Sequence, residues 1–138
     1  MISIAETQNL KACYALRHTV FVAEQGYSAE GEVDELDAVS HHMLACDGDI
    51  PIATARVYLD NDTAKIGRVC VMKSARGLGL GADVIRACVA LATEKGARRA
   101  VLGAQVQAVE FYAKLGFAAY GSVYADEGEP HQMMERRL

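Results

Sequence analysis

The chain has 138 residues, of which 51% are hydrophobic and 23% are charged, ordinary values for a soluble globular protein that folds as one domain over 1–138. Its 14 Lys and Arg residues against 18 Asp and Glu residues give a net charge of −4, which argues against nucleic acid or an anionic membrane as the main partner. The N-terminus shows no signal-peptide pattern, and no apolar run reaches the roughly 20 residues that span a bilayer.

The predicted elements begin with a short apolar strand over 2–5 and an amphipathic helix that runs from Thr7, its expected N-cap, to about Val22. An acidic loop follows over 24–37. Two strand-like runs, over 40–46 and 50–59, are joined at Asp47-Gly48-Asp49, which indicates a hairpin. A second turn leads into a strand over 64–72.

The second half of the chain alternates helices and strands. A glycine-rich turn opens a helix that ends near Lys95, before Gly96. A strand over 99–103, a helix over 106–115 and strands over 117–125 and 131–137 complete the order β-α-β-β-β-α-β-α-β-β. This order predicts the α+β class, with a mixed and mostly antiparallel central sheet of about seven strands flanked by helices on both faces.

The four cysteines, Cys13, Cys46, Cys70 and Cys88, are far apart in the sequence and form no C-x-x-C motif. In a reducing compartment such cysteines are free thiols that fill a core more often than they bind metal. Because the sequence shows neither a signal-peptide pattern nor a membrane-spanning run, it predicts a cytoplasmic protein.

The most informative stretch is the glycine-rich turn, in which Gly77, Gly79 and Gly81 alternate between a strand and a helix. Glycines let backbone amides approach a ligand, and the helix N-terminus adds unpaired donors and a partial positive charge. With the guanidinium of Arg76, these groups predict a phosphate cradle. The spacing is not the dinucleotide G-x-G-x-x-G, and the absence of G-K-[ST] excludes a nucleoside-triphosphate loop. The alternative is a tight turn whose glycines only permit close packing.

The motif Arg76-x-x-Gly79-x-Gly81 resembles the [RQ]-x-x-G-x-[GA] signature of GNAT acetyltransferases, in the same strand-to-helix context. The resemblance implies that the loop binds the pyrophosphate of coenzyme A through main-chain amides. It also implies that the pantetheine arm lies along the preceding strand, in a cleft between 69–72 and 99–103. The implied cofactor-binding residues in this region are Val69, Cys70, Val71, Arg76, Gly77, Leu78, Gly79, Leu80, Gly81 and Ala82.

A second segment, from Gln105 to Phe117, resembles the family pattern N-x-x-A-x-x-x-Y-x-x-x-G-F through Ala108, Tyr112 and Gly116. Gln105, an implied cofactor contact, stands where many members have Asn. The resemblance implies that Tyr112 is the general acid that reprotonates the leaving thiolate. A phenol with an ordinary pKa of about 10 is protonated at neutral pH and suits that role. The alternative is an aromatic ring packed against its neighbours.

Further segments, 21–25, 32–37 and 127–131, are similar to features of a small single-domain bacterial branch of the family, often called ElaA-like. Glu129 departs from that branch, which usually has an apolar residue before the Pro-His pair. The resemblance covers nearly the whole chain.

Several acids and histidines are candidates for the base that takes the proton of the attacking amine. The acidic loop is either a solvated surface or an acidic mouth that attracts a cationic amine. His41 and His42 are adjacent on a strand, point to opposite faces and cannot share a metal ion. No base is assigned. The base candidates are Glu24, Glu32, Asp34, Asp37, His41, His42 and His131, and the candidate substrate contacts are Glu24, Asp37, His41 and His131.

Together these patterns predict an acetyl-CoA-dependent N-acetyltransferase that acts on a primary amine of a small molecule or peptide by direct attack in a ternary complex. Acetyl-CoA is the expected co-substrate, without a metal. The alternative is an acyl-CoA-binding sensor or partner-binding module without turnover. GNAT proteins are often dimers, so the resemblance also allows a homodimer. The identity of the amine stays open.

Overall fold

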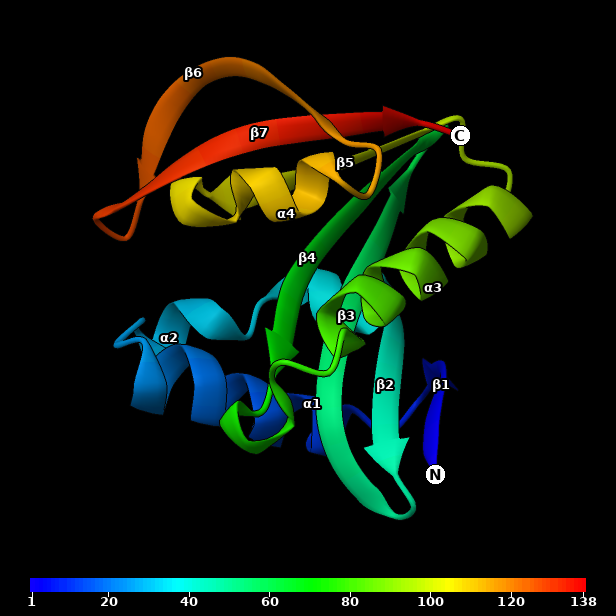
Figure 1. The fold of residues 1–138 in the computed structure, drawn as a ribbon, viewed down its shortest axis with the longest axis vertical. Coiled ribbons are helices and arrows are strands. Elements are labelled where there is room, and N and C mark those ends of the chain that lie inside the picture. The colour runs from blue at the N-terminus through cyan, green and yellow to red at the C-terminus, as the bar shows by residue number, and fades with distance from the viewer.

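The computed structural model describes all residues from 1 to 138 and contains a seven-stranded sheet in the order β1-β2-β3-β4-β5-β7-β6 (Figure 1). Every neighbouring pair is antiparallel except β4 and β5. The predicted class and order of elements are confirmed. The strands are β1 (Ile2–Thr7), β2 (His41–Asp47), β3 (Ile50–Asp60), β4 (Thr63–Val71), β5 (Arg99–Gln105), β6 (Ala118–Asp126) and β7 (Glu129–Arg137).

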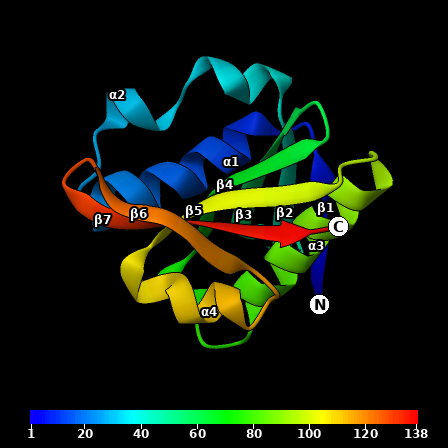
Figure 2. The same cartoon turned by 90° about the horizontal axis from the view of Figure 1, so that it is seen from above.

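The helices cover both faces of the sheet, with α1 and α2 on one side and α3 and α4 on the other (Figure 2). The long helix α3 buries Val84, Ile85 and Cys88 in the main hydrophobic core. No helix is both long enough and apolar enough to cross a membrane. The helices are α1 (Leu10–Arg17), a π-helical continuation (His18–Glu24), α2 (Ala29–Glu32), α3 (Leu80–Glu94) and α4 (Val109–Ala113), with 3-10 turns at Glu35–Val39, Lys73–Ala75 and Val106–Ala108.

The N-terminal helix begins later than predicted. Thr7 ends β1, where it pairs with His42, and Asn9 is the N-cap because its Oδ1 accepts the Ala12 amide at 3.2 Å. The expected cap at Thr7 is therefore wrong. The strand simply runs two residues further than the apolar pattern indicated, since its outer face is exposed.

A bulge in β4 opens the sheet next to its parallel neighbour. Thr54 pairs with Cys70 and Arg56 with Gly67, so two β4 residues stand opposite one β3 residue. One of the two, Arg68, has φ of 52°, and a bulge of this kind bends its strand. β4 pairs with β5 only over 63–65 and 99–101, after which the two strands spread apart (Figure 1). The predicted cleft between them is confirmed.

Candidate active site

The first cavity of the site, about 450 Å³ in volume, lies where β4 and β5 separate. Val69 lines it from β4, Gln105 from β5, Tyr112 from α4 and His131 from β7. Tyr27, which follows the π-helical segment, closes it from the opposite face of the sheet. Elements far apart in the sequence therefore meet at the split, and we call this space the split cavity.

A second cavity, about 590 Å³ in volume, surrounds the glycine-rich turn, and we call it the turn cavity. The backbone amides of 77–82 donate to no carbonyl and to no side chain, so they are free to bind a ligand, and all of these residues except Leu78 line this space. Leu78 is 69% exposed and does not line it. The predicted cofactor residues that do line it are Val69, Cys70, Val71, Arg76, Gly77, Gly79, Leu80, Gly81 and Ala82.

The three glycines of the turn serve different purposes. Gly77 and Gly79 have φ of 86° and 76°, a left-handed conformation that side chains strain. Gly81 has an ordinary backbone, and a Cβ there would lie 3.5 Å from Cζ of Phe111 and 3.8 Å from Cγ2 of Val71. A bulky side chain at Gly81 would therefore fill the cavity without distorting the turn.

Arg76, the charged residue of the turn, is held by Glu24 at the end of the π-helical segment. Its Nη1 and Nη2 donate to the two carboxylate oxygens of Glu24 at 2.5 and 2.7 Å. Its Nε donates to the carbonyl of Val71 at 3.0 Å. The hydrogen bonds from Arg76 lower the pKa of Glu24. Glu24, a predicted substrate contact, thus pairs with the predicted phosphate-binding arginine and lines neither cavity.

Tyr112 lies at the junction of the two cavities, because it lines both of them together with Gln25, Val69 and Ala108. Its ring packs edge-on against Phe111, with centroids 5.0 Å apart. Its hydroxyl has no hydrogen-bond partner in the protein. Every fully buried side-chain oxygen and nitrogen does have one, so the hydroxyl is not fully buried and is open to the cavities. Burial raises the pKa of Tyr112 to about 12.

Gln105 faces the split cavity rather than the turn cavity. Its side-chain amide donates to the hydroxyl of Tyr27 at 3.0 Å and to Oε1 of Gln25 at 3.3 Å. Gln105 thereby ties the end of β5 to the chain that leaves the N-terminal helix.

His131 is 7% exposed and stands opposite Gln105 in the β5–β7 register, at the mouth of the split. Its Nδ1 lies 2.9 Å from the carbonyl oxygen of Glu129, and its Nε2 lies 4.0 Å from Oδ2 of Asp126. Among the predicted substrate contacts, His131 alone lines the split cavity.

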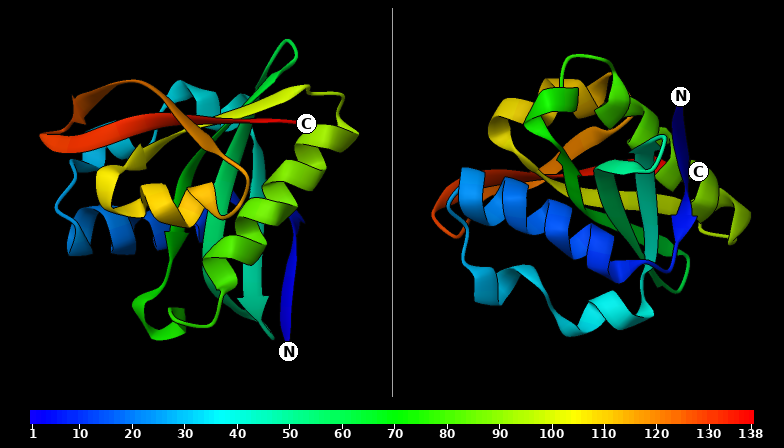
Figure 3. Two further views of the ribbon diagram at one scale, coloured as in Figure 1. Left: turned by 45° about the horizontal axis from the view of Figure 1, so that its top comes forward. Right: turned by 90° about the horizontal axis from the view of Figure 1, so that it is seen from below.

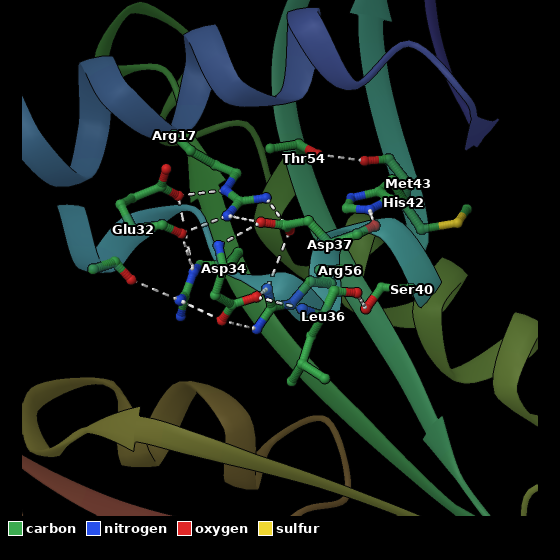
Figure 4. A network of polar contacts seen from close by, with 12 residues as sticks. Arg17, Glu32, Asp34, Leu36, Asp37, Ser40, His42, Met43, Thr54 and Arg56 are labelled. Atoms are coloured by element: carbon green, nitrogen blue, oxygen red, sulfur yellow. Dashed lines mark hydrogen bonds and ion pairs between the residues drawn. The ribbon is translucent and has the colours of Figure 1, made fainter. Parts of the chain in front are cut away.

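Glu32, Asp34 and Asp37 of the acidic loop are paired with arginines (Figure 4), whereas Glu30 and Glu35 are exposed. Arg17 is 1% exposed and donates through Nε to Glu32 and through Nη1 to Asp37 at 2.7 Å. Asp37 is 2% exposed and also accepts from Arg56 at 3.1 Å. Burial alone raises the pKa of Asp37, but hydrogen bonds from Arg17, a backbone amide and Arg56 outweigh it and lower the pKa to about 2. Asp37 lines neither cavity.

Arg68, the bulge residue of β4, joins the same network to the wall of the split cavity. Its Nε donates to the carbonyl of Glu32 at 2.9 Å and its Nη2 to Oδ2 of Asp34 at 3.3 Å. The bulge that opens the sheet is thus tied to α2. We call the six residues Arg17, Glu32, Asp34, Asp37, Arg56 and Arg68 the arginine–carboxylate cluster.

The paired histidines of β2 lie away from both cavities. His42 is buried with its Nε2 2.8 Å from the carbonyl of Asp37, and His41 is half-buried with its Nδ1 2.6 Å from Oε2 of Glu6. The structure does not bring His41, a predicted substrate contact, to the site.

The sequence reasoning missed several residues of the split cavity, among them Tyr27, Tyr124 and Asp126. Tyr124 reaches from β6 across to Gly103 of β5, where any side chain would collide with its hydroxyl. These residues carry no local motif. For Tyr124, an aromatic side chain on an edge strand is the one signal that the sequence offers.

The split sheet, the amide-lined turn and the phenol between two cavities together have the layout of an acyl-CoA-dependent acyltransferase. A family model described as the acetyltransferase (GNAT) domain matches residues 7–138, so the chain belongs to the GNAT acetyltransferase family and is an acyltransferase. The resemblance drawn from the two motifs is confirmed.

Relatives and solved structures agree with this assignment. An uncharacterized N-acetyltransferase of Bacillus subtilis, YjcF, is 38% identical over 130 residues, or 93% of each chain. The crystal structure of a putative N-acetyltransferase from Lactobacillus plantarum matches with a TM-score of 0.92 at 31% identity, covering 99% of this chain and 98% of that one. Escherichia coli ElaA matches with a TM-score of 0.88 at 30% identity over 99% of each chain, which supports the ElaA-like branch.

Proposed function

We propose that the protein transfers the acetyl group of acetyl-CoA to a primary amine by direct attack in a ternary complex. The family supports acyl transfer from acetyl-CoA. The observation that carries the rest is the position of Tyr112, whose side chain borders both the turn cavity and the split cavity. A thioester held on one side and an amine held on the other then meet beside one hydroxyl group.

The cofactor occupies the turn cavity in this proposal. Its diphosphate binds the unpaired amides of 77–82, where the N-terminus of α3 adds partial positive charge. Its pantetheine arm runs along Val69 to Val71, and a main-chain amide near Val71 polarises the thioester carbonyl.

Proton transfer to the departing sulfur is the role proposed for Tyr112. With a pKa raised to about 12, the phenol holds its proton throughout the neutral range. The burial that raises this pKa also raises the proton affinity of a thiolate formed in the same space. Burial likewise raises the pKa of Cys70, beside the turn, to about 12, so its thiol is a poor nucleophile and no acyl-cysteine intermediate is required.

The acceptor enters the split cavity, whose charge favours a cation. Asp126 and Glu127 line the cavity at the β6–β7 turn, and neither is paired with an arginine or lysine. Glu32 and Arg68 line it as well, but both belong to the arginine–carboxylate cluster and offset one another. The remaining negative charge attracts protonated amines.

The test measures thiol release from acetyl-CoA with a panel of amines: 1,4-diaminobutane, spermidine, an amino acid, an aminoglycoside and a short peptide. Tyr112→Phe removes only the hydroxyl, so we expect kcat to fall about a hundredfold while CoA affinity stays unchanged. Gly81→Val fills the turn cavity, so we expect CoA affinity to fall about tenfold, or about 1.4 kcal/mol, in a folded protein.

The matched control is Ala90→Val, which adds the same side chain at an exposed position of α3. Ala90→Val should change neither kcat nor the affinity for CoA. A Tyr112→Phe protein with full kcat across the pH range would remove the phenol from the mechanism. CoA binding by the wild type without thiol release from any amine would instead favour the binding module.

The proposal also includes a cytoplasmic location and a homodimer. The four cysteines are free thiols, which suits a reducing compartment. All nine residues of the edge strand β6 are exposed, Tyr120 and Val123 among them, and an unpaired edge of this kind offers a surface to a second copy. Analytical ultracentrifugation of the wild type measures the mass directly.

A further inference from the structure

We infer that His131 is the general base that takes the proton of the attacking amine, an inference that rests on the proposed function. The argument starts from its location. His131 lines the split cavity, where the acceptor binds in our proposal, and is 7% exposed. It lies opposite Gln105, the last residue of β5 before the chain turns into the helix that carries Tyr112.

The backbone of β7 sets the tautomer of the imidazole. The Nδ1 of His131 lies 2.9 Å from the carbonyl oxygen of Glu129, and a carbonyl only accepts, so Nδ1 carries the proton. In the neutral ring, Nε2 then holds a lone pair. Pro130 stands between the two residues and fixes φ there, which keeps the carbonyl aimed at the ring.

The lone pair on Nε2 is free and faces the cavity. Nε2 makes no hydrogen bond within the protein. Every fully buried side-chain nitrogen and oxygen of the protein has a hydrogen-bond partner, so Nε2 is not fully buried. Nε2 is therefore accessible, and the space that reaches it is the split cavity. A lone pair in a shielded pocket, with its opposite nitrogen fixed by a carbonyl, is the arrangement that a general base needs.

The other titratable groups of the cavity are less suited to the role. Glu32 is engaged by Arg17 and faces Arg68. Asp126 and Glu127 are exposed on the turn, so solvent competes for them. Asp126 instead lies 4.0 Å from Nε2 of His131, where its charge stabilises the imidazolium that forms when the proton arrives.

Several other charged and titratable side chains surround the imidazole of His131. The nearest aromatic one is Tyr124, whose ring centroid lies 5.8 Å from that of the imidazole. All of these side chains belong to residues that line the split cavity or form the β6–β7 turn beside it. They are Tyr124 and Asp126 of β6, Glu127 of the turn, Glu129 of β7, Tyr112 of α4, Tyr27 after the π-helical segment, Glu32 of α2 and Arg68 of β4.

The step balances without any further reactant. The bound ammonium group first gives one proton to water, which leaves a neutral amine. The amine nitrogen then forms a bond to the thioester carbonyl carbon and one of its remaining protons moves to Nε2 of His131, while the carbon–sulfur bond breaks. The sulfur leaves with the electron pair of that bond and takes the proton of the Tyr112 hydroxyl. The imidazolium and the phenolate then regain their starting states by proton exchange through water, leaving an amide and the CoA thiol.

The decisive variant is His131→Asn, because its Nδ2 can still donate to the Glu129 carbonyl while the basic nitrogen is gone. With the most active amine of the panel, we expect kcat to fall about a hundredfold. We also expect the pH dependence of kcat/KM to differ from that of the wild type, because the variant has no imidazole. CoA affinity should stay within twofold. His18→Asn, at an exposed position of the π-helical segment, is the matched control and should behave as the wild type.

A second measurement needs no acceptor. In ¹⁵N-labelled wild type at neutral pH, the ring nitrogens of His131 should report a protonated Nδ1 and an unprotonated Nε2. His131→Gln serves if the Asn variant fails to fold. A proton on Nε2, or an active wild type whose folded His131 variants keep kcat within about threefold, overturns the assignment of the base alone. A wild type that acetylates no amine overturns the proposed function, and this inference with it.

Discussion

Two groups of acidic side chains in this protein have opposite surroundings. In the arginine–carboxylate cluster, Glu32 and Asp37 are buried, and guanidinium groups meet their charge. At the β6–β7 turn, Asp126 and Glu127 face the split cavity with no arginine or lysine beside them. The turn projects past the end of β5 (Figure 3), and Glu127 accepts a hydrogen bond from the Ser28 amide at 3.4 Å.

The difference distinguishes carboxylates that support the fold from carboxylates that are available to a substrate. Asp37, whose two oxygens both accept hydrogen bonds inside the protein, has nothing left for a ligand, and it fixes the elements that it joins. The cluster joins α1, α2 and the bulge of β4, the strand that borders the split. Groups near the turn keep free lone pairs, as Nε2 of His131 does, and so remain available to a substrate. Net acidity in the sequence does not distinguish the two.

The largest expected effect comes from breaking the cluster. Arg17→Met leaves Glu32 and Asp37 buried without their main cation, and we expect a loss of about 3 to 5 kcal/mol in the free energy of unfolding. Urea denaturation measures it. The matched control is Arg86→Met, which breaks an exposed pair with Asp83 and should cost less than about 1 kcal/mol.

If Arg17→Met does not fold, Arg17→Lys gives the same comparison in weaker form, because an ammonium keeps the charge but loses the two-pronged geometry. A loss for Arg17→Met no greater than that of the exposed control would mean that the cluster does not support the fold.

The second expected effect is a dependence of stability on acid. The pKa of Asp37 is lowered from 3.8 to about 2 in the folded protein. A carboxyl group whose pKa is lower in the folded than in the unfolded state stabilises the folded protein at pH values above its unfolded pKa. This contribution disappears as pH falls from about 4 through about 2. A depression of nearly two units corresponds to about 2 kcal/mol. Denaturation midpoints of the wild type and of Asp37→Asn, measured from pH 5 down to pH 2, give the size of this contribution.

The wild type should lose more stability over that interval than Asp37→Asn, which has no carboxyl group to protonate there. Asp83→Asn, on the exposed face of α3, should leave the slope unchanged. Parallel curves for the wild type and Asp37→Asn would contradict the ion pairing described for Asp37.

The cofactor half of the site could be predicted from the sequence because its chemistry is local. Gly77 and Gly79 adopt the left-handed backbone that a strand-to-helix turn requires, and their signal lies within six neighbouring positions. Tyr112 sits one turn into a helix whose start and end are both marked in the sequence. In such segments, spacing along the chain fixes spacing in space.

The acceptor half could not be predicted in the same way. His131 meets Gln105 only through the β5–β7 register, and the acidic loop finds its arginines 15 to 20 residues or more away. Nothing in the sequence around Asp37 distinguishes a buried ion pair from a solvated carboxylate. The sequence shows that a residue is acidic. The fold determines which residue it pairs with, and that partner decides whether the carboxylate is structural or free to bind a ligand.

The smallest expected effect concerns Glu24, which stands between the two kinds of acid. It is paired, but the pair with Arg76 is exposed, so a diphosphate in the turn cavity competes with the carboxylate for the same guanidinium. Glu24→Gln removes the competitor and one negative charge near the phosphates, and both changes favour CoA. We expect CoA to bind tighter by at most about fivefold, the range that exposed ion pairs span, and more clearly at low salt. Calorimetric titration of CoA into both proteins at two salt concentrations measures this. Weaker binding by the Gln variant would show instead that Glu24 holds Arg76 in place for the phosphates, which would put it with the supporting acids of the cluster.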